Sequence, residues 1–267
     1  MSLRAIISII SDLVITSQRQ RYKQLHRAVV SLCLLIIGNV SIADTLRVGV
    51  PTPGQIPFFW LDEAGQYQGI YPDTLRLIAK DLGLTLSFEP LSQARLRRHF
   101  EIGEIDIEMG VSANVDDRRE LKKVSLFTRP FSVVNEVIIY RPELSFPVFI
   151  LKDLAGQRVA TVRGNTVPDN LIREDFTNEW QIAQRVHRGW NNIGLMKEAV
   201  ALYYQREENL DYETSLPYAS NPVSFRINTR IKDKLPDMNS SINRLDEQGI
   251  LEQLVCKYLC GPTINTQ

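Results

Sequence analysis

The chain has 267 residues, of which 44% are apolar and 23% are charged, and it carries as many acidic as basic side chains. These values are ordinary for a soluble globular protein of one or two domains that buries a sizeable core. Five of the 31 basic and one of the 31 acidic residues precede residue 44, so residues 44–267 have a net charge near −4. Such a chain lacks the basic surface that nucleic acid requires, and we expect no nucleic acid partner.

The first 43 residues are predicted to be an N-terminal extension and secretory signal peptide. A basic stretch over residues 19–27 precedes the apolar run Ala28–Ile37, and small residues at Ser41 and Ala43 follow it. This order predicts cleavage near Ala43 and a periplasmic protein. The apolar run is too short to span a bilayer, although a second apolar stretch, Leu3–Ile15, leaves an uncleaved anchor as the alternative.

Strand and helix patterns alternate between residues 46 and 111. We expect strands at Leu46–Pro51, Leu84–Leu91 and Ile105–Val111, and helices at Tyr71–Leu84 and Ala94–Gly103. In the first helix Leu75, Ile78 and Leu82 recur at helical spacing, and Gly83 marks its end. Strands that alternate with helices predict parallel pairing through right-handed crossovers.

A second series of the same kind follows the strand Val133–Tyr140. We expect a strand at Gln157–Gly164, helices at Thr166–Phe176 and Asn191–Glu207, and a strand at Pro222–Ile227. The segment Leu235–Leu259 is predicted to be helical with a break at Gly249. The two series indicate two α/β lobes.

Cys256 and Cys260 are the cysteines that follow residue 43. Export would permit a disulfide between them, but a continuous helix holds positions four apart in poor geometry for that bond unless its last turn unwinds. The sequence leaves both states open. His99 and His187 are isolated from this pair, so we expect no metal site and no cofactor.

The order of these segments resembles the family 3 extracellular solute-binding proteins, the periplasmic receptors of polar amino acid importers. The resemblance rests on LRVGV, PFFWLDEAGQYQGIYPDTLRLIAKDLGL, EIGEIDI, DDRRELKKVSLFTRPF, LKDLAGQRVATVRGNT and LDEQGILEQLVCKYL, in this order and spacing. It implies an α/β clamshell of the periplasmic-binding-protein type. Each of its two lobes would be a mostly parallel sheet flanked by helices, and two hinge strands would join the lobes.

The resemblance also implies how the chain is divided. Residues 44–134 and 223–267 would form lobe 1, and residues 135–222 would form lobe 2. The chain would cross between the lobes near Phe131–Asn135 and Asn221–Phe225. Ligand would then be captured between the lobes by hinge closure.

Arg118 stands where the family's ligand-carboxylate arginine stands, one short loop beyond the strand Ile105–Val111. A guanidinium offers a planar fork of donors that matches a carboxylate. Ser112 and Asn114, in the same loop, are the candidate polar contacts. Arg118 and Arg119 could instead lie on a solvated face and pair with the acids beside them, and we adopt that interpretation for Arg119.

The second anion contact would come from lobe 2, where a strand, a Gly turn and a predicted helix start follow one another. The backbone amides of Asn165, Thr166 and Val167 would hold the negative group, with the helix N-terminus behind them. Thr166 would equally serve as an ordinary N-cap. In the loop after the first strand the family stacks an aromatic ring on its ligand, and we assign that position to Phe59 rather than to either aromatic neighbour.

The chain departs from the family at the ammonium site. Members that bind α-amino acids usually carry an aspartate in lobe 2, whereas HRGWNNIGLMKEAVALYY has none in register. Glu198 would substitute if it faced the cleft, although on a helix it could simply pair with Lys197 or Arg206. Glu108, within an otherwise apolar strand, is the other candidate unless it lies at the strand's exposed end.

These features favour a monomeric periplasmic receptor that captures a small polar solute bearing a carboxylate, such as an amino acid, and hands it to a membrane permease. One alternative is a ligand-sensing lobe for a membrane kinase. Another is a periplasmic enzyme similar to the dehydratases of cyclohexadienyl acids, for which Glu108 or Glu198 would supply the general acid. The sequence contains no recognisable nucleophile with its base and no Gly-rich phosphate loop, which disfavours most other enzymes.

Overall fold

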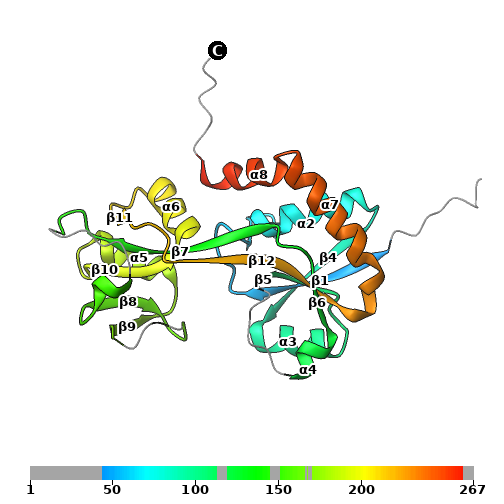
Figure 1. The fold of residues 1–267 in the computed structure, drawn as a ribbon, viewed down its shortest axis with the longest axis horizontal. Coiled ribbons are helices and arrows are strands. Elements are labelled where there is room, and N and C mark those ends of the chain that lie inside the picture. Colours follow the sequence, from blue (N-terminus) through cyan, green and yellow to red (C-terminus); the bar gives the residue numbers. More distant parts are fainter. Residues whose placement is uncertain (1–43, 113–118, 145–150, 166, 168–169, 261–267) are drawn as a thin grey trace, which may run out of the picture. The chain divides into compact units, whose positions relative to one another are not determined.

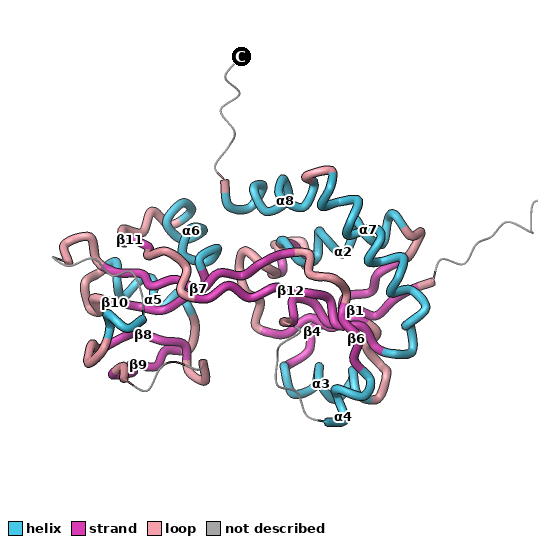
Figure 2. Tube along the Cα trace, viewed as in Figure 1, coloured by secondary structure: helices cyan, strands magenta, loops and turns pink. Residues whose placement is uncertain are grey.

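The computed structural model describes residues 44–112, 119–144, 151–165, 167 and 170–260 (Figure 1). The strands are β1 Thr45–Thr52, β2 Trp60–Leu61, β3 Tyr67–Gln68, β4 Thr85–Ser92, β5 Ile107–Val111, β6 Ser125–Phe127, β7 Ser132–Tyr140, β8 Arg158–Val162, β9 Ile172–Phe176, β10 Ile193–Lys197, β11 Glu213–Thr214 and β12 Ala219–Asn228. The helices are α2 Ile70–Asp81, α3 Gln93–Glu101, α4 Arg119–Val124, α5 Glu179–His187, α6 Glu198–Glu207, α7 Leu235–Glu247 and α8 Ile250–Leu259 (Figure 2). Within the described part of the chain, no helix has both the length and the apolar character needed to cross a membrane.

Strand β1 lies between β4 and β5, and both pairings are parallel, as the sequence predicts. Packing explains why β1 contains a glycine, Gly49. A Cβ atom at Gly49 would lie 2.1 Å from Leu96 Cδ1, so the bare backbone lets α3 pack directly against the strand. The register of β1 with β5 places Gly49 opposite Glu108.

Two long strands join the two parts of the main sheet, whose order is β4-β1-β5-β12-β7-β10-β8-β9. Strand β12 pairs with β7 through Ala219–Val223 and with β5 through Ser224–Ile227. Strand β7 pairs with β12 through its first half and with β10 through Glu136–Tyr140. We call the part built around β1 lobe 1 and the part built around β10 lobe 2; β7 and β12 run between them (Figure 1).

The fold is therefore the two-lobed α/β clamshell with two hinge strands that the resemblance implies. The expected boundaries, between residues 134 and 135 and between residues 222 and 223, fall within the stretch where β7 and β12 pair with each other. The residue at which the lobes divide within this stretch stays a prediction.

The helix expected at Thr166–Phe176 is wrong where the structure describes it. Residues Ile172–Phe176 form strand β9, which pairs in parallel with Arg158–Val162 of β8. Thr161 Oγ1 donates a hydrogen bond to Asp175 Oδ1 over 2.7 Å between the two strands. A partner strand outweighs local spacing here, because strand preference depends mainly on cross-strand packing.

The helix expected at Asn191–Glu207 is half wrong, because Ile193–Lys197 form strand β10 and only Glu198–Glu207 are helical. Residues Ile193–Met196 are all buried, as befits a strand that lies between β7 and β8. A short continuous apolar run fits a buried strand and a buried helix equally well by periodicity. Helices α4 and α5 had not been expected.

The C-terminal helices α7 and α8 meet at Gly249, as predicted. Cys256 and Cys260 form a disulfide, and Cys260 already has the extended backbone angles φ −87° and ψ 137°. Helix α8 therefore ends at Leu259, directly before the second cysteine of the pair. Arg206 of α6 donates hydrogen bonds to the carbonyl oxygens of Tyr258, at 2.9 Å, and Cys260, at 3.1 Å, so a side chain of lobe 2 satisfies the end of α8.

Candidate ligand cleft

The carboxyl ends of four strands, one in lobe 1 and three in lobe 2, meet at one cavity of about 390 Å³. Strand β1 ends at Thr52, β8 at Val162, β9 at Phe176 and β10 at Lys197. In α/β proteins ligands bind in the crevice outside the carboxyl ends of the strands, and cavities of about 300 to 1,000 Å³ hold small molecules. Lobe 1 contributes Pro51, Thr52, Pro53, Gly54, Gln55, Ile56, Phe59 and Gln93, and lobe 2 contributes Val162, Asn165, Thr177, Asn178, Glu179, Lys197, Val200 and Tyr204.

The loop between β1 and β2 forms the lobe 1 wall. The carbonyl oxygen of Gln55 accepts hydrogen bonds from the backbone N–H groups of Phe58, at 2.8 Å, and Phe59, at 2.9 Å. This tight loop places Phe59 at the cavity with 7% of its surface exposed. Phe58 and Phe59 both stack on Tyr71, with 5.1 Å and 6.1 Å between ring centroids. Neither Phe58 nor Trp60 is among the residues that line the cavity.

The start of helix α5 forms much of the lobe 2 wall. Asn178 Oδ1 accepts a hydrogen bond from the Gln181 backbone N–H over 3.0 Å, which caps the helix. Gln181 Oε1 in turn accepts from the Thr177 backbone N–H at 3.0 Å and from Thr177 Oγ1 at 2.8 Å. This reciprocal capping fixes the first turn, so Glu179 is held at the positive end of the helix dipole.

Glu179 and Lys197 are the residues with a formal charge among the described lining of the cavity. Glu179 Oε1 accepts from the Lys197 backbone N–H at 2.9 Å and from Lys197 Nζ at 3.4 Å. Glu179 Oε2 accepts from Gln55 Nε2 at 2.6 Å, a direct hydrogen bond between the lobes. Burial, and then the nearby charge of Glu179, raises the pKa of Tyr204 to about 12, so its hydroxyl stays protonated at neutral pH.

A cavity between two α/β lobes that share two hinge strands suits a protein that binds a small molecule, and the sequence matches a family of such proteins. The model described as bacterial extracellular solute-binding proteins, family 3, matches residues 46–261. The chain belongs to this family. It is a family of extracellular binding proteins by description.

Relatives of this family 3 protein agree with the assignment. The probable amino-acid-binding protein YxeM of Bacillus subtilis (strain 168) is 26% identical over 141 residues, which are 52% of this chain and 51% of that protein. The chain thus matches about half the length of this curated relative. An ancestral cationic amino acid solute-binding protein has a TM-score of 0.68 and 24% identity, covering 80% of this chain and 95% of its own.

A further solved structure shows the same fold. The putative binding component of an ABC transporter from Wolinella succinogenes DSM 1740, complexed with lysine, has a TM-score of 0.68 and 20% identity. The match covers 82% of this chain and 97% of that one. At these identities the likeness establishes the fold.

The anion contacts predicted for this family 3 protein lie only partly within the described residues. Arg118, Asn114 and Thr166 lie outside them, so their roles stay predictions. Asn165 is described and lines the cavity. Ser112 directly follows β5 and is half-buried, but it is not among the lining residues. Because Ile172–Phe176 is a strand, no helix runs on through those residues to support the anion site expected at Thr166.

The two acids proposed for the ammonium site both have other partners. Glu108 is buried in lobe 1 rather than at an exposed strand end, and its Oε2 lies 2.8 Å from Arg226 Nη1. Its Oε1 accepts from Gln93 Nε2 at 3.3 Å. Glu198, the first residue of α6, accepts from Asn135 Nδ2 of hinge strand β7 at 2.7 Å. Neither acid is among the residues that line the cavity.

Sequence reasoning missed the charged residues of the described lining, Glu179 and Lys197. One signal was present: Asn178 followed three residues later by Gln181 is a helix N-terminus pattern. This pattern predicts a helix that begins at Glu179, and therefore an acid in the first turn of that helix. Lys197 was assigned to a helix interior, where a role at a strand end could not be recognised.

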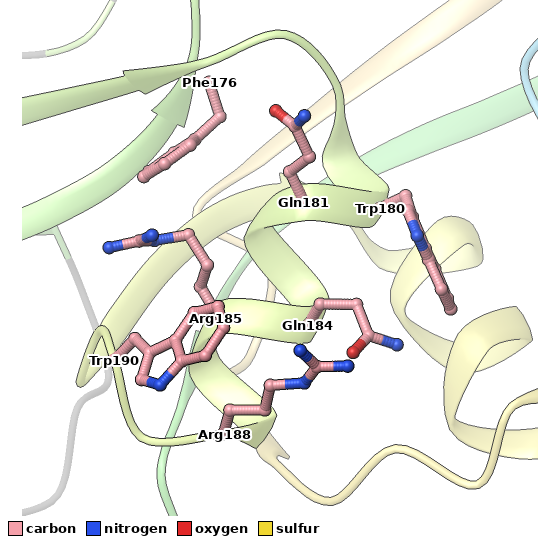
Figure 3. Close-up of a pocket in the computed structure, with 7 residues that line it drawn as sticks. All are labelled: Phe176, Trp180, Gln181, Gln184, Arg185, Arg188 and Trp190. Carbon is pink, nitrogen blue, oxygen red and sulfur yellow. The ribbon is translucent and has the colours of Figure 1, made fainter.

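A second hollow, of about 440 Å³, lies wholly on lobe 2 beside α5 (Figure 3). It is lined by Phe176, Trp180, Gln181, Gln184, Arg185, Arg188 and Trp190. Figure 3 shows the Arg185 guanidinium between Phe176 and Trp190, with 4.6 Å and 5.6 Å to the ring centroids. Arg185 also donates to Asn191 Oδ1 at 2.6 Å and Glu174 Oε1 at 3.2 Å. These contacts fix the turn after α5, and we assign no ligand to this hollow.

Proposed function

We propose that the protein is an extracytoplasmic receptor that captures a small polar solute bearing a carboxylate, an amino acid or a related compound, and hands it to a membrane importer. The observation that carries this proposal is the cavity at the strand ends, which takes residues from both lobes. The lobes are joined by β7 and β12. A change in the backbone of these two strands would open and close the cavity as a hinge.

The chemistry of the cavity wall suits a polar zwitterion. Its described lining offers the carboxamides of Gln93, Asn165 and Asn178, which both donate and accept hydrogen bonds. The carboxamide of Gln55, also in the lining, is bonded to Glu179. The neighbouring Glu179 and Lys197 supply one charge of each sign, and the ring of Phe59 supplies an apolar face. Names of the similar proteins refer to amino acids and, in one case, to bound lysine. Arg118 is proposed to bind the ligand's carboxylate from the loop after β5.

The experiment that tests this function is a thermal-shift screen of the protein produced from residues 1–267. The ligands are the L-amino acids, small mono- and dicarboxylates, amines and sugars. A ligand present at about a hundred times its dissociation constant stabilises the folded state by about 2.7 kcal/mol, which is an easily visible shift. We expect the largest shifts in melting temperature from amino acids or close analogues. If none of the carboxylates shifts the melting temperature, the proposal is contradicted.

The fate of the bound compound separates the receptor from the dehydratase alternative. The compound that gives the shift is incubated with the protein, recovered and analysed by mass spectrometry. A receptor returns it unchanged. Recovery of a product lighter by one water, or by one water and one carbon dioxide as aromatisation of a cyclohexadienyl acid requires, would replace the receptor with a dehydratase.

Export is tested on the same preparation. Cleavage after Ala43 predicts a mature protein that begins at Asp44 in the extracytoplasmic fraction. Intact-mass analysis gives the first residue directly. A membrane-bound protein that retains residues 1–43 would favour the uncleaved anchor.

A further inference from the structure

Glu179 is a nearly buried acid in the lining of the cavity. It lies at the cavity, yet only 6% of its surface is exposed. Burial of a carboxylate is costly unless hydrogen-bond donors satisfy it. The number of donors that reach Glu179 therefore decides whether the protein alone satisfies it.

The two oxygens of this carboxylate are not equally satisfied. Oε1 accepts from the backbone N–H and from Nζ of Lys197, at 2.9 Å and 3.4 Å. Among the described residues, Gln55 is the one whose side chain donates to Oε2, from Nε2 at 2.6 Å. An ionised carboxylate has about four acceptor positions, two on each oxygen. Oε2 therefore retains one acceptor position beside the cavity.

The donor on Oε2 is neutral and comes from the other lobe. Gln55 belongs to the backbone-bonded loop of lobe 1, 124 residues from Glu179. A hydrogen bond from a neutral amide to a carboxylate is weaker than one from a cation. A ligand that carries an ammonium or guanidinium group would form a stronger contact with Oε2 than Gln55 does.

Lys197 directs that cation to Oε2. Its Nζ contacts Oε1, so a second cation at Oε1 would meet a like charge. Lys197 itself is held in place, because its backbone N–H is bonded to the same oxygen at the end of β10. Oε2 therefore has the remaining acceptor position and is also the oxygen that the positive charge of Lys197 does not contact.

We propose that Glu179 binds a cationic nitrogen of the ligand through Oε2, and that Gln55 Nε2 competes for this oxygen in the ligand-free protein. This inference rests on the proposed function. It makes Glu179 the residue that distinguishes an amino acid from the corresponding acid without an amino group. It also explains what replaces the missing aspartate of lobe 2. The replacement is Glu179 on α5, rather than Glu108 on β5 or Glu198 on α6.

The test measures discrimination between paired probes. Each L-amino acid that shifts the melting temperature is compared by titration calorimetry with the carboxylic acid of the same carbon skeleton that lacks the α-amino group, for example glutamate with glutarate. Glu179→Gln keeps the size of the side chain and an acceptor for the Lys197 amide. We expect it to weaken binding of the amino acid about thirtyfold or more, with less than about a threefold change for the des-amino acid.

Two further variants complete the test. Glu207→Gln makes the same chemical change at an exposed end of α6 and should change neither affinity. Gln55→Ala removes the competing donor and should tighten amino acid binding about threefold, with the des-amino acid unaffected. Because its effect has the opposite sign, it remains informative if Glu179→Gln folds poorly.

The outcomes separate this inference from the proposed function. A wild-type protein that binds neither member of any pair contradicts the receptor itself. If the wild type binds the amino acid and folded Glu179→Gln retains the preference over the des-amino acid, Glu179 is not the cation-binding group. Selective weakening by Gln55→Ala would likewise overturn the inference, because it would place Gln55 on the ligand.

Discussion

Arg226 and Glu108 form an ion pair in the interior of lobe 1, with 2.8 Å between Nη1 and Oε2 and side-chain exposures of 2% and 5%. The pair joins hinge strand β12 to β5, and Gln93 links Glu108 to the wall of the cleft. Removing one member takes this oppositely charged partner from the other, which stays buried. Glu108→Gln should therefore lower the free energy of unfolding by about 3 to 5 kcal/mol.

Urea denaturation measures this loss. The double variant Glu108→Leu with Arg226→Met replaces the pair by apolar side chains and should recover most of the stability. A loss below about 1 kcal/mol in Glu108→Gln would show that the ion pair does not bear on folding.

Arg118→Ala tests the carboxylate anchor that the sequence assigns to the loop after β5. If Arg118 holds the ligand's carboxylate, its truncation should cost about 2 to 5 kcal/mol of binding free energy. Arg119→Ala is the matched control, because Arg119 is an exposed residue that begins α4. Titration calorimetry with a ligand found in the thermal-shift screen measures both. Equal affinities of the two variants would remove Arg118 from the site.

Glu136, on hinge strand β7, should destabilise the protein at neutral pH. Burial raises its pKa; Lys197 opposes this effect, and the charge of Glu179 adds to it. The folded state thus holds the proton more tightly than the unfolded state does. The resulting stability is fully present below the unfolded pKa of about 4.3 and is lost as the pH rises through the folded pKa.

Glu136→Gln removes this titration. We expect a higher unfolding free energy than that of the wild type at pH 7, and little difference at pH values near 3.5. Urea denaturation at the two pH values gives the comparison. A variant that is less stable than the wild type at pH 7 would mean that ionised Glu136 stabilises the hinge.

Gly110 and Gly83 separate backbone strain from crowding at the end of β5. Both have positive φ, 67° at Gly110 and 64° at Gly83. A Cβ atom at Gly110 would lie 2.1 Å from Tyr71 Cε2, whereas a Cβ atom at Gly83 would have no neighbouring atom within 4 Å. Gly83→Ala should cost about 1 to 2 kcal/mol, the penalty of a left-handed alanine. Gly110→Ala should cost at least about 1 kcal/mol more, because an extra group must be fitted into a packed interior. Equal losses by urea denaturation would mean that Tyr71 moves aside freely.

Much of the fold follows from local sequence pattern, and the predictions that were wrong share one physical cause. Helix α2 was predictable because Leu75 and Ile78 recur at helical spacing and Gly83 ends the segment. Strands β9 and β10 were not, because each owes its form to pairing with other strands, β9 with β8 and β10 with the more distant β7. Ile193–Met196 fit a helix locally, and only their position between two strands makes them extended.

Which residues line the cavity was predictable where this depends on chain order and was not where it depends on contacts; the roles of these residues toward a ligand stay predictions. Phe59 and Asn165 follow directly from the loops after β1 and β8, and both line the cavity. Glu108 carried the same sequence signal as a ligand-binding acid, but its partner Arg226 lies 118 residues away. Glu179 depends on a helix that the pattern analysis did not identify. A pattern does not reveal which acid a distant base will neutralise.

The central claim is that the ligand occupies the cavity between the lobes, and a cavity-filling variant tests it most directly. Thr52 is exposed at the end of β1 and lines the cavity, whereas Thr85 is exposed at the start of β4, away from it. Calorimetric titration of the strongest ligand from the screen compares Thr52→Trp with Thr85→Trp. We predict that Thr52→Trp weakens binding at least about a hundredfold while Thr85→Trp binds normally. Wild-type affinity in a folded Thr52→Trp would place the ligand elsewhere and contradict the account.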